Sequence, residues 1–381
     1  MNVMNWTLVG CGNPLKLVER EGPQPQGSEV LMAVTHCGVC HSDLYFQDGF
    51  YDLGGGQTPS LADRGVKLPM VPGHEVAGVV VAVGPDARGV SVGDKGVAFP
   101  WAGCGKCGRC RAGQEHLCFA PETLGVFRPG GYGTHVLLKR PEHLIDVSGI
   151  DPALAATYAC SGVTAYSAAK KLMPLLAGEA VVVFGAGGLG LAAISIVRAL
   201  SPDTRIIAVD VSAGRLELAA AAGAAATLVV GAGDLAARIQ AAAGQPVSGV
   251  LDFVGSTQTA EASLAAIAKG GRYVAVGLFG GSLTLQLPLV PLRGISILGS
   301  YVGSLSEMQE LVTLAKEGKL QPTPIERVSH DDPNKALDRV RHGDLRGRPR
   351  KDEARIVCLA AHGVVTRTIA VAGDDRDLGH D

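Results

Sequence analysis

Four cysteines stand close together in the first half of the chain. Within 15 residues the sequence places Cys104, Cys107, Cys110 and Cys118, with glycines beside them that allow a tightly folded backbone. Four thiolates can hold one Zn²⁺ tetrahedrally, which leaves no position open for a substrate. Disulfides and an iron–sulfur cluster are the alternatives, and the very short loops disfavour disulfides. The spacing predicts a structural zinc site that orders residues 103–118.

A glycine-rich turn follows the apolar run 180–184 and precedes a helix-compatible stretch. Gly185 would permit the tight turn, Gly187 would let backbone N–H groups approach a phosphate, and Gly190 would let the helix pack against its strand. Gly188 and Leu189 open that helix, whose start carries partial positive charge. This pattern alone is weak evidence, but its strand and helix context predicts a bound dinucleotide.

An acidic residue stands at the distance that such a turn requires. Asp210 follows the apolar run 206–209, twenty residues after Gly190. A carboxylate there would accept hydrogen bonds from the ribose hydroxyls, and it would repel a 2′-phosphate. The sequence therefore favours NAD over NADP, and we expect Arg215 to lie among the cofactor-binding residues as well.

Further potential metal ligands are scattered outside the cysteine cluster. Cys40 stands in a Cys-His-Ser-Asp stretch, His74 precedes Glu75, and Cys160 lies far along the chain. Their spacing alone does not join them. A buried cysteine is usually an inert small hydrophobe, and a lone histidine is more often a hydrogen-bonded core or surface residue.

Taken together, these motifs resemble the zinc-containing alcohol dehydrogenases of the medium-chain dehydrogenase/reductase family. The resemblance covers roughly residues 28–345 and includes the Gly-Ser-Tyr-Val-Gly segment 299–303. It implies an α/β fold, in which a Rossmann doubly wound parallel sheet joins a mainly-β GroES-like catalytic domain. It also implies a reversible hydride transfer between a primary or secondary alcohol and NAD. The alternatives are a polyol, sugar or formaldehyde dehydrogenase on the same scaffold, or a catalytically silent binding protein.

The resemblance also implies roles for the scattered residues. Cys40, His74 and Cys160 would hold a second, catalytic zinc, giving two zinc ions per chain, and Glu75 would enter its ligand shell transiently. Asp43 would fix the tautomer of His74. Zn²⁺ lowers the pKa of an oxygen ligand, so an alcohol could lose its proton near neutral pH.

The same resemblance assigns the proton path and the pocket. Ser42 would accept the alcohol proton and pass it towards the nicotinamide ribose, and His41 would contact the pyrophosphate. Tyr45 departs from the family, since many relatives end the relay with a histidine there, so Tyr45 would either pack on the substrate or leave the proton to water. The expected pocket residues are Trp101, Phe50 and Leu124.

Elements of two kinds would position these residues. Short strands between glycine and proline turns dominate residues 28–150, and a loop at 49–68 would rim the site. After Pro152, strands at 180–184, 205–209, 227–230, 248–254 and 271–277 alternate with helices near 188–200, 213–222, 233–243 and 257–269. This alternation is typical of a parallel sheet with crossover helices.

The expected division places a catalytic domain at 1–151, a nucleotide-binding domain at 152–287 and a return to the first domain at 288–345. A further strand at 295–302 and a helix from about Ser304 lie in this return. The tail 346–381 is unlike the family. Either Arg355–Leu359 replaces a strand after an insertion, or the tail is an unrelated extension that includes a second β-like piece, Val364–Val371.

Composition limits the possible partners. The chain has 381 residues, with 34 basic and 36 acidic residues and a net charge of −2, so we expect a small alcohol or aldehyde as ligand rather than a nucleic acid or a membrane. We find neither a leader pattern nor an apolar run long enough to span a bilayer, which predicts a cytoplasmic protein. By the resemblance the chain would form a homodimer or homotetramer through the strand at 295–302.

Overall fold

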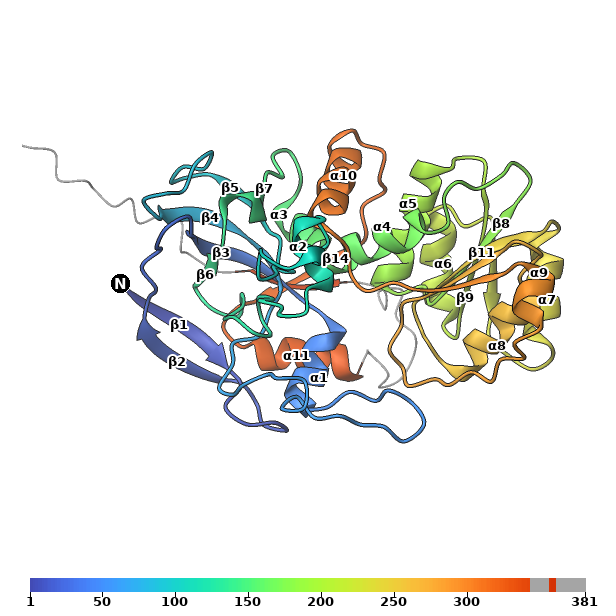
Figure 1. The fold of residues 1–381 in the computed structure, drawn as a ribbon, viewed down its shortest axis with the longest axis horizontal. Helices are drawn as coiled ribbons and strands as arrows, with labels where there is room; N and C mark the ends of the chain where they lie inside the picture. The colour runs from blue at the N-terminus through green and yellow to red at the C-terminus, as the bar shows by residue number, and fades with distance from the viewer. Residues whose placement is uncertain (343–355, 361–381) are drawn as a thin grey trace, which may run out of the picture.

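The computed structural model describes residues 1–342 and 356–360. Its elements form two lobes, each built around its own sheet (Figure 1). The lobe on the left of Figure 1 contains the first strands of the chain, and the lobe on the right contains the parallel strands that follow. None of the helices in these described residues is both long and apolar enough to cross a membrane.

Six parallel strands form the sheet of the right-hand lobe. Their order is β10 (Ala226–Val229), β9 (Arg205–Asp210), β8 (Ala180–Phe184), β11 (Val247–Asp252), β12 (Arg272–Ala275) and β13 (Ser296–Gly299). Every residue of β8 is buried, because helices cover both faces of the sheet and its valines pack on either side. The predicted doubly wound sheet is confirmed.

Helices connect these strands. They are α5 (Gly188–Leu200), α6 (Ala213–Ala221), α7 (Leu235–Ala243), α8 (Thr257–Ala266) and α9 (Leu289–Arg293). Side chains of Ser212, Asp234 and Ser256 accept hydrogen bonds from the first turns of α6, α7 and α8, which fixes where these helices begin. Helix α8 ends three residues before the expected position, and Ile267 is already extended.

The left-hand lobe is mainly β, as expected. Its larger sheet runs β14 (Ile325–Ser329), β15 (Ile356–Ala360), β3 (Val30–Val39), β4 (Glu75–Val83), β5 (Lys95–Ala98) and β7 (Leu144–Ile145), and β6 (His135–Leu138) also pairs with β3. A separate hairpin joins β1 (Asn2–Thr7) to β2 (Lys16–Glu21). The short helices of this lobe are α1 (His41–Asp48), α2 (Gly108–Arg111) and α11 (Pro333–His342).

Strand β15 shows which of the two alternatives for the tail holds. It lies parallel to β14 and antiparallel to β3, so the segment around 356–360 supplies a strand of the catalytic sheet. The remaining β-like piece, Val364–Val371, lies outside the described residues, as does Arg355.

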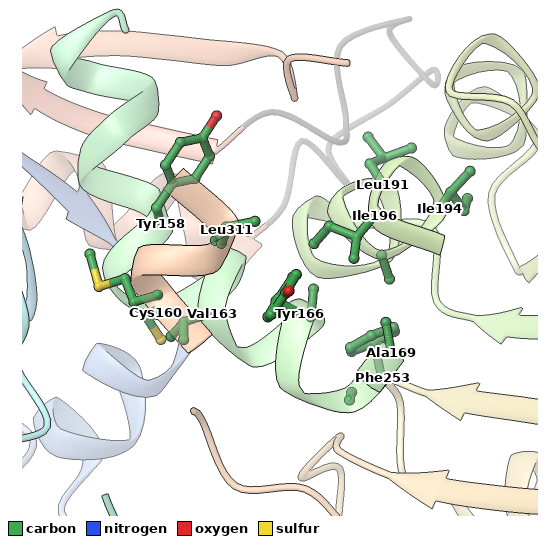
Figure 2. Close-up of a cluster of buried hydrophobic side chains, with 14 of the residues drawn as sticks. Tyr158, Cys160, Val163, Tyr166, Ala169, Leu191, Ile194, Ile196, Phe253 and Leu311 are labelled. Carbon is green, nitrogen blue, oxygen red and sulfur yellow. The ribbon is translucent and has the colours of Figure 1, made fainter. Parts of the chain in front are cut away.

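Buried helices join the two lobes. Helix α3 (Pro152–Thr157), a π-helical turn at Tyr158–Gly162 and helix α4 (Val163–Lys170) follow one another without a break, and α10 (Leu305–Lys316) packs against them. Figure 2 shows Cys160 near one end of the resulting core and Ala169 near the other, with Leu311 and Ile196 packed from neighbouring helices. This core fixes Cys160 relative to both sheets.

Candidate metal centres and cofactor site

Three elements bring Cys40, His74 and Cys160 together. Cys40 caps the start of α1, His74 precedes β4, and Cys160 lies in the π-helical turn, a rare geometry that is frequent at functional sites. The two sulfur atoms are 3.9 Å apart, and the ligand atoms of all three residues lie within 4.8 Å of one another. These residues, 120 positions apart at the extremes, thus share one point in space.

Asp43 holds two of these residues in place. Its Oδ2 atom accepts hydrogen bonds from the backbone N–H of Cys40 at 3.0 Å and from the hydroxyl of Tyr132 at 2.9 Å. Its Oδ1 atom lies 3.6 Å from Nδ1 of His74, inside the protein. Nδ1 therefore faces the carboxylate, and Nε2 is the ring nitrogen left to face a ligand.

Glu75 lies beside the same point. Its Oε1 atom accepts a hydrogen bond from the backbone N–H of Ser161 at 3.2 Å, while Oε2 is buried without a hydrogen-bond partner among the described residues. Burial raises the pKa of Glu75 to about 8. Gly38 makes room for this side chain, because a Cβ atom there would lie 1.9 Å from Oε2.

The donor set fits a zinc ion. Both ring nitrogens of His74 are buried without a hydrogen-bond partner in the described structure, which is costly unless a ligand satisfies one of them. A hydrogen bond from Cys160 lowers the pKa of the Cys40 thiol, and the same bond raises the pKa of Cys160. A metal cation would displace that shared proton and hold both sulfurs as thiolates. Two sulfurs and one imidazole leave a fourth position for a substrate, as a catalytic zinc site requires.

The four clustered cysteines form the second candidate centre. Sulfur–sulfur distances are 3.9 Å between Cys104 and Cys110, 3.5 Å between Cys107 and Cys110, and 3.7 Å between Cys107 and Cys118. All four ligand atoms lie within 4.8 Å of one another. Gly103 is needed next to this point, because a Cβ atom there would lie 2.5 Å from the sulfur of Cys110. The geometry fits a closed tetrahedral zinc site.

A buried carboxylate that the sequence analysis missed stabilises the cysteine-bearing loop 103–118. Glu115 accepts a hydrogen bond from the backbone N–H of Gly103 at 2.9 Å and pairs with Arg140 and with His143 at 3.5 Å. Burial would raise the pKa of Glu115, but the hydrogen bonds from His143 and Gly103 and the charge of Arg140 lower it to about 2. Its position between Cys110 and Cys118 was the sequence feature that could have indicated this role.

The glycine turn has the geometry that its spacing predicts. Gly185 has a φ of 86°, a left-handed conformation that favours glycine, and a Cβ atom on Gly190 would lie 1.8 Å from the carbonyl oxygen of Gly185. A Cβ atom on Gly187 would meet nothing within 4 Å, so the backbone is open to a ligand exactly where helix α5 begins. This open helix start suits a pyrophosphate.

Asp210 ends β9 beside this turn. It accepts hydrogen bonds from the backbone N–H groups of Ala186 at 2.7 Å and Ser212 at 2.9 Å, and Arg215 lies 3.7 Å away. Asp210 and Arg215 thus stand together next to the glycines, as a nucleotide ribose would require.

The residues of the expected proton path all lie on α1. Ser42 donates a hydrogen bond to the sulfur of Cys40 at 3.2 Å. Tyr45 instead turns to the other lobe, where its hydroxyl donates to the carbonyl of Leu278 at 3.1 Å. The ring of His41 lies 5.3 Å from that of Tyr45 and 5.4 Å from that of Phe279, and burial lowers the pKa of His41. Helix α1 therefore meets the nucleotide-binding lobe at residues 278–279.

The three expected pocket residues lie in different surroundings. Trp101 packs its ring 5.5 Å from His74 and donates from its indole N–H to Ala159 at 2.7 Å, so it borders the metal ligands. Phe50 is 44% exposed on the loop after α1, and Leu124 is buried in the core of the catalytic lobe. Tyr301, whose ring is 6.0 Å from Trp101, lies in the segment 299–303 but was not predicted to line the pocket.

Comparisons with known proteins agree with this geometry. Residues 26–148 match the model of the alcohol dehydrogenase GroES-like domain, and residues 188–317 match that of the zinc-binding dehydrogenases. A protein of Sulfurisphaera tokodaii named NAD-dependent alcohol dehydrogenase is 38% identical over 90% of this chain and 97% of its own length. A protein of the same name from Saccharolobus solfataricus is 36% identical over 90% of this chain and 97% of its own length.

A solved structure extends the likeness to three dimensions. The alcohol dehydrogenase of Aeropyrum pernix superimposes with a TM-score of 0.78 at 28% identity, and the match covers 94% of this chain and 99% of that one. The zinc-ligand geometry, the glycine turn and these matches lead to one conclusion. The chain belongs to the zinc-containing alcohol dehydrogenases of the medium-chain dehydrogenase/reductase family.

Proposed function

We propose that this protein is an NAD-dependent alcohol dehydrogenase that transfers a hydride reversibly between a primary or secondary alcohol and NAD⁺. The observation that carries the proposal is the meeting of Cys40, His74 and Cys160 within 4.8 Å, next to a helix that touches the nucleotide-binding lobe. A catalytically silent protein would have no need of two thiols beside a buried histidine whose ring nitrogens find no hydrogen-bond partner among the described residues.

Each side chain has a defined part in this reaction. Cys40, His74 and Cys160 would hold the catalytic zinc, and a bound zinc supplies Lewis acidity that favours loss of the alcohol proton. Ser42 is placed to take up that proton, because its hydroxyl lies within hydrogen-bond distance of the sulfur of Cys40. Asp43 orients His74, and Glu75 offers a buried carboxylate oxygen beside the ligands.

The cofactor would lie across the start of α5. Gly185, Gly187 and Gly190, with Gly188 and Leu189 at the helix start, would bind its pyrophosphate, and Asp210 would accept hydrogen bonds from the ribose. His41 stands where α1 meets the nucleotide-binding lobe and would contact the pyrophosphate from the other side. Tyr45 donates to Leu278 rather than standing free, so we propose that water carries the proton out.

Metal analysis combined with kinetics tests the proposal. We expect two zinc ions per chain, and we expect removal of the catalytic ion by a chelator to abolish NADH formation from alcohols. A panel of primary, secondary, aromatic and polyol substrates would separate an alcohol dehydrogenase from a polyol or sugar dehydrogenase. Full activity after complete zinc removal would refute the proposal.

The assembly follows from the edge of the parallel sheet. Strand β13 is the last strand of this sheet, and its Ile297 is 39% exposed, while nearby Leu292 is 71% exposed. Exposed apolar side chains next to an unpaired strand edge are typical of an interface. We therefore propose a homodimer or homotetramer that forms through β13, and a cytoplasmic location.

A further inference from the structure

A positive charge lies on aromatic rings in the loop that follows α1. The guanidinium of Arg64 stands 4.1 Å from the centre of the Tyr51 ring. Tyr51 is buried, and its ring lies 4.8 Å from that of Tyr45 on α1. The loop reaches across to the other lobe, because a Cβ atom on Gly54 would lie 2.7 Å from the carbonyl of Gly280 (Figure 1). Arg64 is thus held near the junction of the two lobes.

A second row of aromatic rings begins at the metal ligands. Tyr301 lies 6.0 Å from Trp101, and Trp101 lies 5.5 Å from His74. Burial raises the pKa of Tyr301, the charge of Arg64 opposes this rise, and Cys160 adds to it. Trp101 and Tyr301 thus form a row of rings that starts at His74.

No carboxylate of the described residues forms an ion pair with Arg64. The neighbouring Asp63 is engaged by Ser60, whose backbone N–H and hydroxyl donate to it at 2.9 and 2.8 Å. Asp52 accepts a hydrogen bond from the backbone N–H of Gly54 at 2.8 Å. Arg64 therefore offers a planar set of donors that matches a carboxylate.

We propose that the preferred substrate carries a carboxylate at the end opposite its reacting carbon, and that Arg64 binds this carboxylate. The substrate class is an alcohol with an apolar spacer and an acid group, whose spacer lies along Trp101, Tyr301 and Tyr51. This inference rests on the proposed dehydrogenase function. In the oxidation the carbinol C–H bond breaks, its hydride reduces NAD⁺ to NADH, and the hydroxyl proton leaves to solvent, so a hydroxy acid becomes an oxo acid.

The test compares 5-hydroxypentanoate with pentan-1-ol, which share chain length and the reacting hydroxyl. We expect the wild type to prefer the hydroxy acid in kcat/KM, and Arg64→Met to lower the ratio of the two kcat/KM values by about 10- to 100-fold, the worth of a charge-assisted hydrogen bond. Arg64→Lys should restore part of the preference. Added salt should weaken the preference of the wild type, because Arg64 is exposed.

Lys67→Met is the matched control, since it removes one positive charge from the same loop. Among the described residues Lys67 makes no cation–π contact. An unchanged substrate ratio in Arg64→Met would overturn the inference. An equal loss of kcat/KM with both substrates would also overturn it, because Arg64 would then only fix the loop on Tyr51. A rise confined to the KM of NAD⁺ would overturn it too, because Arg64 would then bind the cofactor. Turnover of pentan-1-ol by the wild type would uphold the dehydrogenase function in each of these cases.

Discussion

At the scale of single residues, we expect the choice of cofactor to depend on one carboxylate. Asp210 is held by the backbone N–H groups of Ala186 and Ser212, so its orientation is fixed before any nucleotide binds. Arg215, 3.7 Å away, partly balances its charge. The two side chains favour different cofactors. A carboxylate favours the ribose hydroxyls of NAD, and an arginine favours the 2′-phosphate of NADP.

Replacing Asp210 with alanine should therefore shift the enzyme towards NADP. The change removes the repulsion of the 2′-phosphate and frees Arg215 to bind it, so we expect kcat/KM with NADP relative to NAD to rise by about tenfold or more, which corresponds to about 1.4 kcal/mol. Steady-state kinetics with both cofactors measures this ratio. The double variant Asp210→Ala/Arg215→Ala is the control and should lose most of the gain. An unchanged ratio in the single variant would argue against the ribose role.

The two sets of cysteines should respond differently to the loss of one ligand. Cys40→Ala removes a ligand of the open site, so we expect turnover to be lost while the melting temperature changes little and one zinc per chain remains. Cys107→Ala removes a ligand of the closed site, so we expect mainly a lower melting temperature. Activity, zinc content and thermal unfolding distinguish the two. The opposite pattern would show that the roles of the two sites are exchanged.

The sequence predicted the local part of these sites much better than the distant part. The cysteine cluster and the glycine turn are encoded within 15 residues or fewer, and the structure has the expected geometry at Gly185 and Gly190. The prediction that Cys40, His74 and Cys160 share one site depended on the family resemblance, because these residues lie in separate elements. Tyr51 and Arg64 were missed, since no local pattern marks side chains that meet only within a folded loop, and Tyr301 was included in the segment 299–303 without a role.

At the scale of elements, the cysteine-bearing loop 103–118 shows how a segment that buries little apolar surface is kept in one conformation. Helix α2 has only four residues and none of them is buried, so packing stabilises it weakly. Glu115 fixes the loop instead, by tying Gly103 to Arg140 and His143. Its charge-assisted pairing with Arg140 makes it an anchor of this loop that does not depend on a metal.

Glu115→Gln should lower the free energy of unfolding by about 1–3 kcal/mol at neutral pH, because it leaves buried donors with a weaker acceptor. The folded pKa of about 2 lies below the unfolded value of about 4.3, so the contribution of Glu115 is present above pH 4.3 and is lost as pH falls towards 2. The difference between wild type and variant, measured by denaturant unfolding, should therefore shrink over this range.

Glu142→Gln is the control for this prediction. Its carboxylate lies 4.0 Å from the same Arg140 but is 67% exposed, so its loss should change the free energy of unfolding by less than about 1 kcal/mol. Equal effects of the two substitutions would show that Glu115 does not anchor the lobe.

The order of the elements was predictable where the hydrophobic periodicity was strong, and alternatives stayed open where a strand pairs with distant segments. The strands of the parallel sheet lie within a few residues of their expected positions, because each is an apolar run bounded by turns. The sequence predicted a strand at β15 only as one of two alternatives. The basic segment 346–350, which is unlike the family, precedes β15 in the chain and obscured its place beside β14 and β3. Pairing over such a distance leaves no trace in local sequence.

At the scale of the whole molecule, the β13 edge of the parallel sheet is the surface through which we expect two copies of the chain to associate. Among the described residues, strand β13 pairs with β12 alone, and its Ile297 is partly exposed to solvent. We expect Ile297→Lys to weaken self-association by at least tenfold, because a charge on an edge strand opposes strand pairing between copies. Light scattering after size-exclusion chromatography measures the change. Val92→Lys, at an exposed site of the catalytic lobe, should leave the assembly unchanged, and a monomeric wild type would refute the interface.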